Sequence, residues 1–230
     1  MTPRNPGPSS TAKILPFPAQ RSKAEQRKIL RLSPEYDGQC LLYKHQALSS
    51  EKLYAIRILC WARLADGRTV ALVPWLGGVS RCIDLDNPQT GQASGYYDPK
   101  TERCYSAVPN HHITALDTVL ENAPPSRTTN GQAVQEIPDM IGSHAAILND
   151  EQEYVLESVV SWQLCDNGEM KAMLADPKKI TQLPVLAGDP CLYAAQDNSG
   201  FRYYFQYHIA NQIKNGGAMS TRALNKLLHP

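Results

Sequence analysis

The most apolar stretch of the chain, residues 53–76, is divided in two by the dipeptide Asp66-Gly67. Asp-Gly between apolar runs is typical of a tight β-hairpin, because the turn needs residues that tolerate positive φ. Apolar residues occupy every second position of the first arm, at Tyr54, Ile56, Ile58, Cys60, Ala62 and Leu64. Both faces of each arm also carry apolar residues, which predicts a central hairpin covered on both sides. A helix between Ser50 and Gly67 is the alternative interpretation.

Shorter apolar segments extend this interpretation over the rest of the chain. They predict strands over 29–32, 40–45 and 79–85, and hairpins over 96–105, 154–174 and 191–209. Two segments have apolar residues at helical spacing, 112–121 and a short C-terminal stretch after Ser220. The sequence therefore predicts an α+β fold, made mainly of antiparallel β-hairpins with two to four helices. It also suggests two similar lobes.

The alternation of polar and apolar stretches suggests four regions. Residues 1–28 are rich in proline, serine and basic residues, which predicts a disordered basic tail. Residues 29–122 are expected to form a first β-rich lobe, 123–143 a linker or long loop, and 144–230 a second β-rich lobe that ends in a helix.

The two predicted lobes share one sequence feature. Trp61 and Gly67 align with Trp162 and Gly168, both at a spacing of 101 residues, and each Trp precedes an Asp-containing turn. One interpretation is an internal duplication, and the other is that two unrelated hairpins use the same turn chemistry. In either case we expect both tryptophans to be core residues, each packed under its own hairpin.

Charge is distributed unevenly along the chain. Residues 1–32 contain seven basic residues and one acidic residue, whereas the remainder contains 16 basic and 21 acidic residues. The sequence has no apolar run of membrane-spanning length and no apolar secretion signal, which predicts a cytoplasmic protein without membrane contact. Its six cysteines form no CxxC pair, and we expect them to be reduced thiols.

Cys104, His111 and His112 are the weak candidates for a catalytic site. They lie close together in sequence, and a thiol nucleophile needs a nearby base such as histidine. Their spacing matches no family signature, so a simple helix entry at the two histidines is the alternative. The histidines and cysteines have no zinc-type spacing, and no phosphate-binding or dinucleotide-binding glycine pattern occurs. We therefore expect no metal site and no cofactor.

The segment 201–209 is the candidate for nucleic-acid binding, because aromatic and polar residues alternate along it. Aromatic rings on an exposed strand can stack on bases while basic residues hold phosphates. The alternation assigns Tyr204 to the outward face, whereas Phe201, Tyr203, Phe205 and Tyr207 are expected in the core. The candidate nucleic-acid-binding residues are Arg21, Lys23, Arg27, Lys28, Arg31, Arg202 and Tyr204.

Three functions are compatible with these patterns. The first is a non-enzymatic regulatory or adaptor protein that binds a macromolecule, most simply another protein, through its basic tail or an exposed sheet. The second is a nucleic-acid-binding accessory protein that uses the tail and the aromatic strand, although the acidic body opposes a broad phosphate-binding surface. The third is an enzyme whose cysteine and histidine site is assembled from distant residues. An exposed aromatic strip beside lysines favours the second function, and a deep pocket with close cysteine and histidine favours the third.

Overall fold

The computed structural model describes residues 28–45, 52–75, 78–81, 85, 91–108, 131–215 and 219–220. Within these ranges the chain contains one α-helix, α3 (Tyr207–Lys214), and one 3-10 turn, η2 (Ala195–Asp197). The remaining elements are antiparallel strands that curl into a half-barrel. The predicted α+β fold with two to four helices is therefore wrong. The helices expected over 112–121 and after Ser220 fall on residues outside the described ranges.

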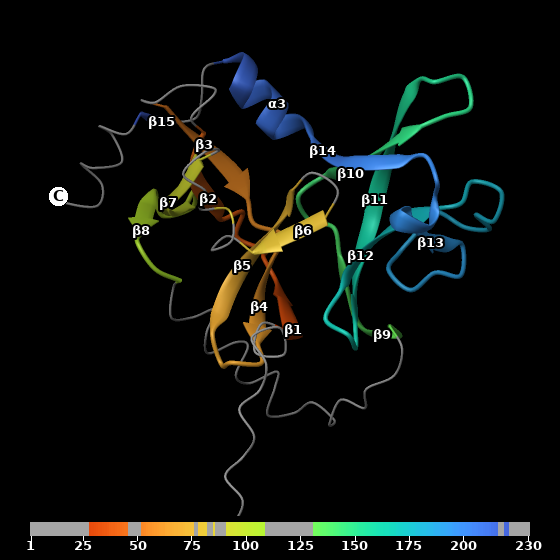
Figure 1. Ribbon diagram of the computed structural model, residues 1–230, viewed down its shortest axis with the longest axis horizontal. Coiled ribbons are helices and arrows are strands. Elements are labelled where there is room, and N and C mark those ends of the chain that lie inside the picture. Colours follow the sequence, from red (N-terminus) through yellow and green to blue (C-terminus); the bar gives the residue numbers. More distant parts are fainter. Residues whose placement is uncertain are drawn as a thin grey trace, which may run out of the picture.

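The strands form three sheets, which Figure 1 shows in the colours of the sequence. The first sheet has the order β1-β4-β5-β6 and consists of β1 (Ile29–Pro34), β4 (Cys60–Leu64), β5 (Thr69–Trp75) and β6 (Gly78–Arg81). The second has the order β15-β3-β2-β7-β8, with β15 (Met219–Ser220), β3 (Lys52–Arg57), β2 (Cys40–His45), β7 (Gly91–Asp98) and β8 (Arg103–Tyr105). The third has the order β13-β12-β11-β10-β14, and β9 pairs with β11 beside β10. Its strands are β13 (Leu192–Ala194), β12 (Met170–Ala175), β11 (Tyr154–Cys165), β10 (Ser143–Leu148), β14 (Phe201–Gln206) and β9 (Ala133–Pro138).

The predicted central hairpin is present as β4 and β5 around Asp66-Gly67. Gly67 adopts a φ of +85°, and the Arg68 amide donates to Asp66 Oδ1 at 3.0 Å, as a tight turn with an Asx contact requires. The first arm is interrupted at Ile58-Leu59, so that β3 and β4 belong to different sheets. Every residue of β4 is buried, which explains why apolar residues occur on both faces of this segment.

Within the described residues, sheet faces cover one another. Trp61 on β4 faces a core that it shares with Ile56, Ile58 and Tyr96. Its neighbours Cys60 and Ala62 point the other way into a second core. That second core also contains Trp162 and many apolar side chains of the third sheet. Because β4 contributes side chains to both cores, the described antiparallel strands pack on one another in layers.

The strand pairing of the N-terminal part is repeated in the C-terminal part. In the N-terminal part, β1 pairs with β4 and β2 pairs with β3. In the C-terminal part, β9 and β10 both pair with the long strand β11. The next strand, β5 or β12, forms a hairpin with β4 or β11 and is flanked by β6 or β13. The last strand, β7 or β14, returns to pair with β2 or β10. Trp61 pairs with Ala71 and Trp162 with Ala172, so the 101-residue spacing is kept across both hairpins.

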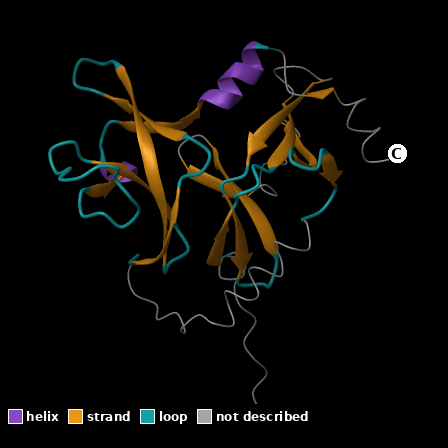
Figure 2. Cartoon of the chain, turned by 180° about the vertical axis from the view of Figure 1, so that it is seen from behind, coloured by secondary structure: helices purple, strands orange, loops and turns teal. Residues whose placement is uncertain are grey.

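The tryptophans occupy matching places in the two repeats. Both side chains are fully buried, as predicted. Trp61 packs against Tyr96 with ring centroids 5.4 Å apart, and Trp162 packs against Tyr204 at 5.0 Å. Each tyrosine lies on the strand that closes its own repeat, β7 or β14. The view from behind in Figure 2 shows the two strand-rich halves side by side.

Three contacts join the repeats into one body. The Gln135 side chain accepts a hydrogen bond from the Leu32 amide at 2.9 Å and donates to the Leu32 carbonyl at 2.8 Å. In the same way, the Gln212 side chain of α3 accepts a hydrogen bond from the Ala55 amide of β3 at 2.7 Å and donates to the Ala55 carbonyl at 2.9 Å. Strand β15, which follows α3, then pairs with β3. Strand β9 lies within the segment that the sequence predicts as a linker, and it supplies Gln135 to this junction.

Candidate functional site

Five rings gather on one face of the third sheet, around the start of α3. We name this surface the outer aromatic face, and its members are His144 on β10, Tyr154 on β11, Tyr203 and Phe205 on β14, and Tyr207 at the start of α3. Tyr207 makes edge-to-face contacts with His144 at 5.1 Å and with Phe205 at 4.9 Å between ring centroids. Tyr154 and Tyr203 form a second pair at 5.9 Å. Edge-to-face and tilted pairs of this kind hold the rings in fixed orientations.

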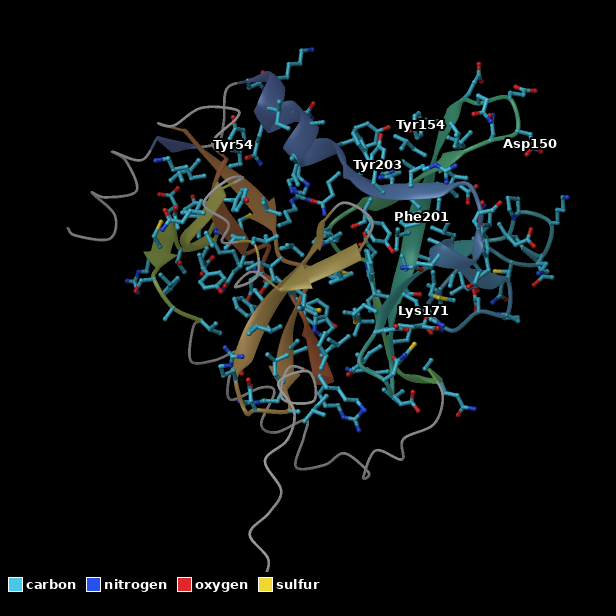
Figure 3. The ribbon with its side chains drawn as sticks, viewed as in Figure 1. Tyr54, Asp150, Tyr154, Lys171, Phe201 and Tyr203 are labelled. Atoms are coloured by element: carbon cyan, nitrogen blue, oxygen red, sulfur yellow. The ribbon has the colours of Figure 1, made fainter. Side chains whose placement is uncertain are left out.

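Within the described residues, the outer aromatic face is exposed, whereas the other half of the same sheet is partly covered. The segment that follows β12 folds back over β9, where the Gly188 amide donates to Glu136 Oε1 at 3.0 Å. At the opposite end of β11, Tyr154 is 59% exposed and Tyr207 is 53% exposed. Figure 3 shows Tyr154 and Tyr203 together beside the tip of the β10–β11 hairpin. Large rings that remain this exposed in a fixed cluster are typical of binding surfaces.

The surroundings of this face are acidic. Asp150, Glu151 and Glu153 lie exposed in the β10–β11 turn, which leads directly into Tyr154. Residues 131–215 contain eleven acidic and five basic side chains. A surface that combines exposed tyrosines with carboxylates attracts cations, because ring faces and carboxylates both carry negative potential.

Tyr204, the aromatic residue assigned outward from the sequence, is buried, and that assignment is wrong. It pairs with Ala145, packs on Trp162, and accepts a hydrogen bond from Gln196 Nε2 at 2.6 Å. Burial raises the pKa of its hydroxyl well above the usual value. The cause of the error is an irregularity in β14, where Tyr203 pairs with Ala146 but Phe201 pairs with Ile147. The side-chain alternation therefore shifts by one residue, and Phe201 and Tyr204 both face the core.

A second irregularity explains why the sequence did not identify Tyr154 as exposed. The simple alternation places Tyr154 on the same face as Trp162, which is fully buried. The pairing of β11 with β12 shifts between Val159 and Ser161, so that the two ends of β11 present opposite faces. The signal available in the sequence was Ser158, a polar residue that interrupts the apolar face of the predicted strand.

Among the described candidates for nucleic-acid binding, Tyr204 is buried and therefore does not share an exposed surface with Arg202. Arg202 is exposed, but it lines a polar pocket with Asp150 and Glu157 and donates to the carbonyls of Ser199 and Phe201 at 2.9 and 3.0 Å. Lys28 and Arg31 belong to the first strand segment, at the start of the described chain. The other three candidates, Arg21, Lys23 and Arg27, lie outside the described residues. The predicted hairpin over 191–209 is also wrong, because β13 pairs with β12 while β14 pairs with β10.

Of the three catalytic candidates, only Cys104 lies within the described residues. Cys104 lies half-buried on β8, and burial raises the pKa of its thiol. A nucleophilic cysteine needs the opposite shift. His111 and His112, the proposed bases, lie outside the described residues. No group of three or more metal-binding side chains occurs within the described ranges.

Comparisons with known proteins give no further assignment. The described part of the chain contains no helix that is long and apolar enough to cross a membrane. No protein-family model matches the sequence, and neither a curated protein nor a solved structure gives a match.

Proposed function

We propose that this protein is a non-enzymatic binding protein that recognises a basic segment of a partner protein on its outer aromatic face. The observation that supports this function best is the fixed cluster of exposed rings beside an acidic turn. Tyr154 and Tyr207 are each more than half exposed, yet both have a defined ring partner. Exposed rings that are already oriented lose little conformational entropy when a partner docks.

The chemistry of the face selects cations over anions. A lysine or arginine placed over an exposed tyrosine ring gains roughly 0.5–1 kcal/mol, and the nearby carboxylates of Asp150, Glu151 and Glu153 add long-range attraction. Phosphates of a nucleic acid would meet the same carboxylates and be repelled. The acidic turn therefore favours a protein partner, and binding of single-stranded nucleic acid by base stacking is the alternative that the experiment must separate.

The proposal also covers the compartment in which the protein acts. We infer that it is a cytoplasmic protein with reduced thiols, as the sequence predicts. Support comes from the five described cysteines, none of which forms a disulfide. Four of them are buried: Cys40, Cys60, Cys165 and Cys191. Disulfides form and persist in oxidising compartments, so buried cysteines left as thiols are typical of proteins from a reducing one.

The test is a titration of the full-length protein with labelled peptides of equal length, one rich in lysine and arginine and one rich in glutamate, and with single-stranded DNA. Fluorescence anisotropy measures the Kd. Replacement of Tyr154 or Tyr207 by alanine should weaken binding of the basic peptide about 2–5-fold each. The matched control is Tyr36→Ala, because Tyr36 is 65% exposed but lies in the first repeat, away from the outer aromatic face.

The acidic side chains of the β10–β11 turn allow a second test. Replacement of Glu151 and Glu153 by lysine should weaken binding of the basic peptide further and make it less sensitive to salt. Because Tyr154 and Tyr207 are exposed, the free energy of unfolding of both alanine variants should lie within about 0.5 kcal/mol of that of the unmodified protein. Tighter binding to DNA than to the basic peptide, or equal losses in Tyr36→Ala, would refute the proposed function.

A further inference from the structure

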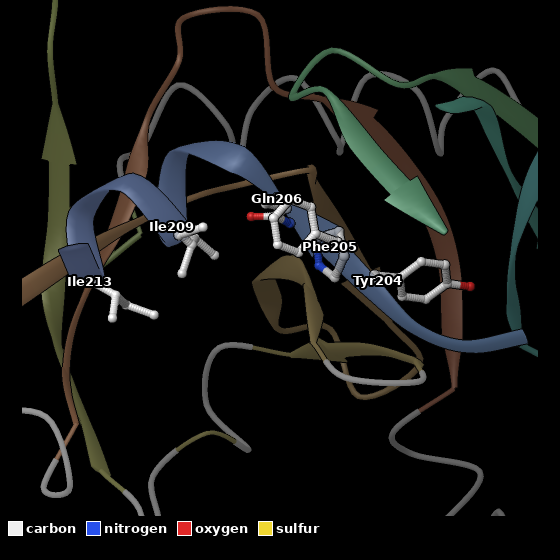
Figure 4. Close-up of a pocket in the computed structure, with 7 residues that line it drawn as sticks. Tyr204, Phe205, Gln206, Ile209 and Ile213 are labelled. Atoms are coloured by element: carbon white, nitrogen blue, oxygen red, sulfur yellow. The ribbon is translucent and has the colours of Figure 1, made fainter. Parts of the chain in front are cut away.

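An apolar groove lies where β14 continues into α3, against the end of β5. It has a volume of about 200 Å³. Its walls are formed by Pro74 from the first repeat, by Phe205, and by Ile209, Ala210 and Ile213 along one side of α3. Figure 4 shows Ile209 and Ile213 on consecutive turns of the helix, with Gln206 at its start. A cavity of about 150 Å³ accommodates a benzene ring, so this groove has room for one apolar side chain with part of its backbone.

Gln206 is the unusual residue of this groove. Its side chain is 4% exposed, yet neither Nε2 nor Oε1 has a hydrogen-bond partner anywhere in the described structure. A buried polar group left without a partner costs roughly 1–3 kcal/mol, and most buried amides are paired for this reason. An unpaired amide donor and an unpaired amide acceptor therefore lie together, both buried, in the wall of an otherwise apolar groove.

The same protein shows twice what a glutamine side chain does in this situation. Gln135 binds the N–H and the C=O of one residue, Leu32, with its acceptor and its donor. Gln212 binds the N–H and the C=O of Ala55 in the same two-bond arrangement. In both cases the residue held belongs to an extended strand, at a position where no described strand pairs with it on that side. Gln206 offers the same pair of groups, and its partner is missing.

We propose that the Gln206 groove binds one apolar residue of an extended peptide segment of a partner protein, with the side chain in the groove and the backbone N–H and C=O on the Gln206 amide. This inference rests on the proposed function and identifies the kind of segment that is bound. Phe205 lines the groove and also belongs to the outer aromatic face. One segment therefore reaches both surfaces, with its apolar residue at Gln206 and its basic residues over the rings beside Tyr207.

The smallest probe of the groove is N-acetyl-leucine N′-methylamide, which carries one apolar side chain, the N–H and C=O of one leucine between an acetyl C=O and a methylamide N–H, and no charge. Titration of the full-length protein with this probe, followed by amide NMR, should shift signals of residues 204–213 and give a Kd. An analogue methylated on the leucine nitrogen lacks the N–H and should bind at least tenfold more weakly.

Gln206→Met is the decisive variant, because methionine preserves the shape of the side chain and removes both polar groups. Since the replaced amide is unpaired, this variant should fold with an unchanged or higher Tm. It should bind the probe at least tenfold more weakly and should no longer distinguish the probe from its N-methyl analogue. Gln39→Met is the matched control, since Gln39 is a buried glutamine outside the groove, and it should leave the Kd unchanged.

The outcomes separate this inference from the proposed function. If the uncharged probe does not bind, or binds equally well to Gln206→Met, the inference is wrong, whatever the basic peptide does at Tyr154 and Tyr207. If the probe binds as described but replacement of those tyrosines does not change the Kd of the basic peptide, the groove inference holds and the proposed function is wrong. Loss of probe binding in Gln39→Met as well would overturn the assignment of the site to Gln206.

Discussion

The indole N–H of Trp162 donates a hydrogen bond of 2.8 Å to Oδ1 of Asp139, a residue in the break between β9 and β10. The other carboxylate oxygen accepts from the amides of Gly142 and Ser143, at 2.7 and 2.9 Å. One carboxylate thus ties the buried tryptophan to the turn that redirects the neighbouring strand. Charge-assisted hydrogen bonds of this type are stronger than neutral ones.

The first repeat has the same arrangement. Trp61 donates to Oε2 of Glu35 at 2.6 Å, and the amides of Asp37 and Gln39 donate to Oε1. Both acidic residues follow a proline that ends the preceding strand segment. The two repeats therefore match in sheet topology, in the position of the tryptophan and in the contact between acid and indole. An internal duplication explains this match better than shared turn chemistry does.

The first prediction concerns the acid of the second repeat. Asp139→Ala leaves three donors without their acceptor, including the indole N–H of the fully buried Trp162. We expect a loss of about 3 kcal/mol in the free energy of unfolding, measured by urea denaturation, and about half of that for Asp139→Asn. Asp150→Ala removes an exposed carboxylate and should change stability by less than about 0.5 kcal/mol. Equal stability of Asp139→Ala and Asp150→Ala would contradict this role.

The second prediction concerns His208 on α3. Its Nε2 accepts a hydrogen bond of 3.3 Å from the Arg57 amide, so the ring is neutral when α3 is docked. Burial, and then the positive charge of Arg57, lower the pKa of His208 to about 4. Unfolded histidine titrates near 6.5, so the unfolded state binds more protons between these values. The stabilising contribution is complete above pH 6.5 and is lost as the pH falls toward 4, by on the order of 2 kcal/mol.

Two measurements check the histidine prediction. In His208→Gln, which keeps an acceptor but does not titrate, the free energy of unfolding should fall less steeply between pH 6.5 and pH 4. Hydrogen exchange at the amides of Ala55 and Arg57, which donate to α3 side chains, should accelerate over the same range. The Leu59 amide, which donates to the Leu72 carbonyl, is the internal control. Parallel pH curves for the two proteins would show that His208 does not contribute.

The third prediction tests the enzyme alternative through Cys104. Because burial raises the pKa of this thiol, its alkylation by iodoacetamide at neutral pH should be no faster than that of an unperturbed cysteine. The fully buried Cys60 should react only on unfolding. Peptide mapping by mass spectrometry after timed alkylation gives both rates. An unusually fast reaction at Cys104 would favour the third function, in which this residue is a nucleophile.

The sequence predicted those features that depend on local chemistry. Asp66-Gly67 specified the β4–β5 hairpin because few other dipeptides tolerate the turn, and the hairpin of β7 and β8 forms around Asp98-Pro99 as expected. Burial of Trp61 and Trp162 followed from the apolar pattern around them. These features require only neighbouring residues, and their signals lie within a few positions of one another.

The features that the sequence did not predict depend on distant partners. The strand irregularity near Arg202 has no local marker and the one near Val159 has only Ser158, yet each reverses the face on which later side chains lie. They are the reason that Tyr154 was placed inside and Tyr204 outside. The return of β14 to β10 was also missed, because β13 is closer in sequence but already pairs with β12. The outer aromatic face and the Gln206 groove both depend on this long-range return.

During synthesis, strand β3 is made long before the residues that contact its edge. Strand β3 is made early, but its free edge is satisfied by His208, Gln212 and β15, all near the end of the chain. At about 5–20 residues per second, this edge waits roughly 8–30 s for its partners. During that interval it is open to pairing with other nascent chains. Synthesis rate and chaperone supply, more than the final stability of the protein, should therefore set its yield in cells.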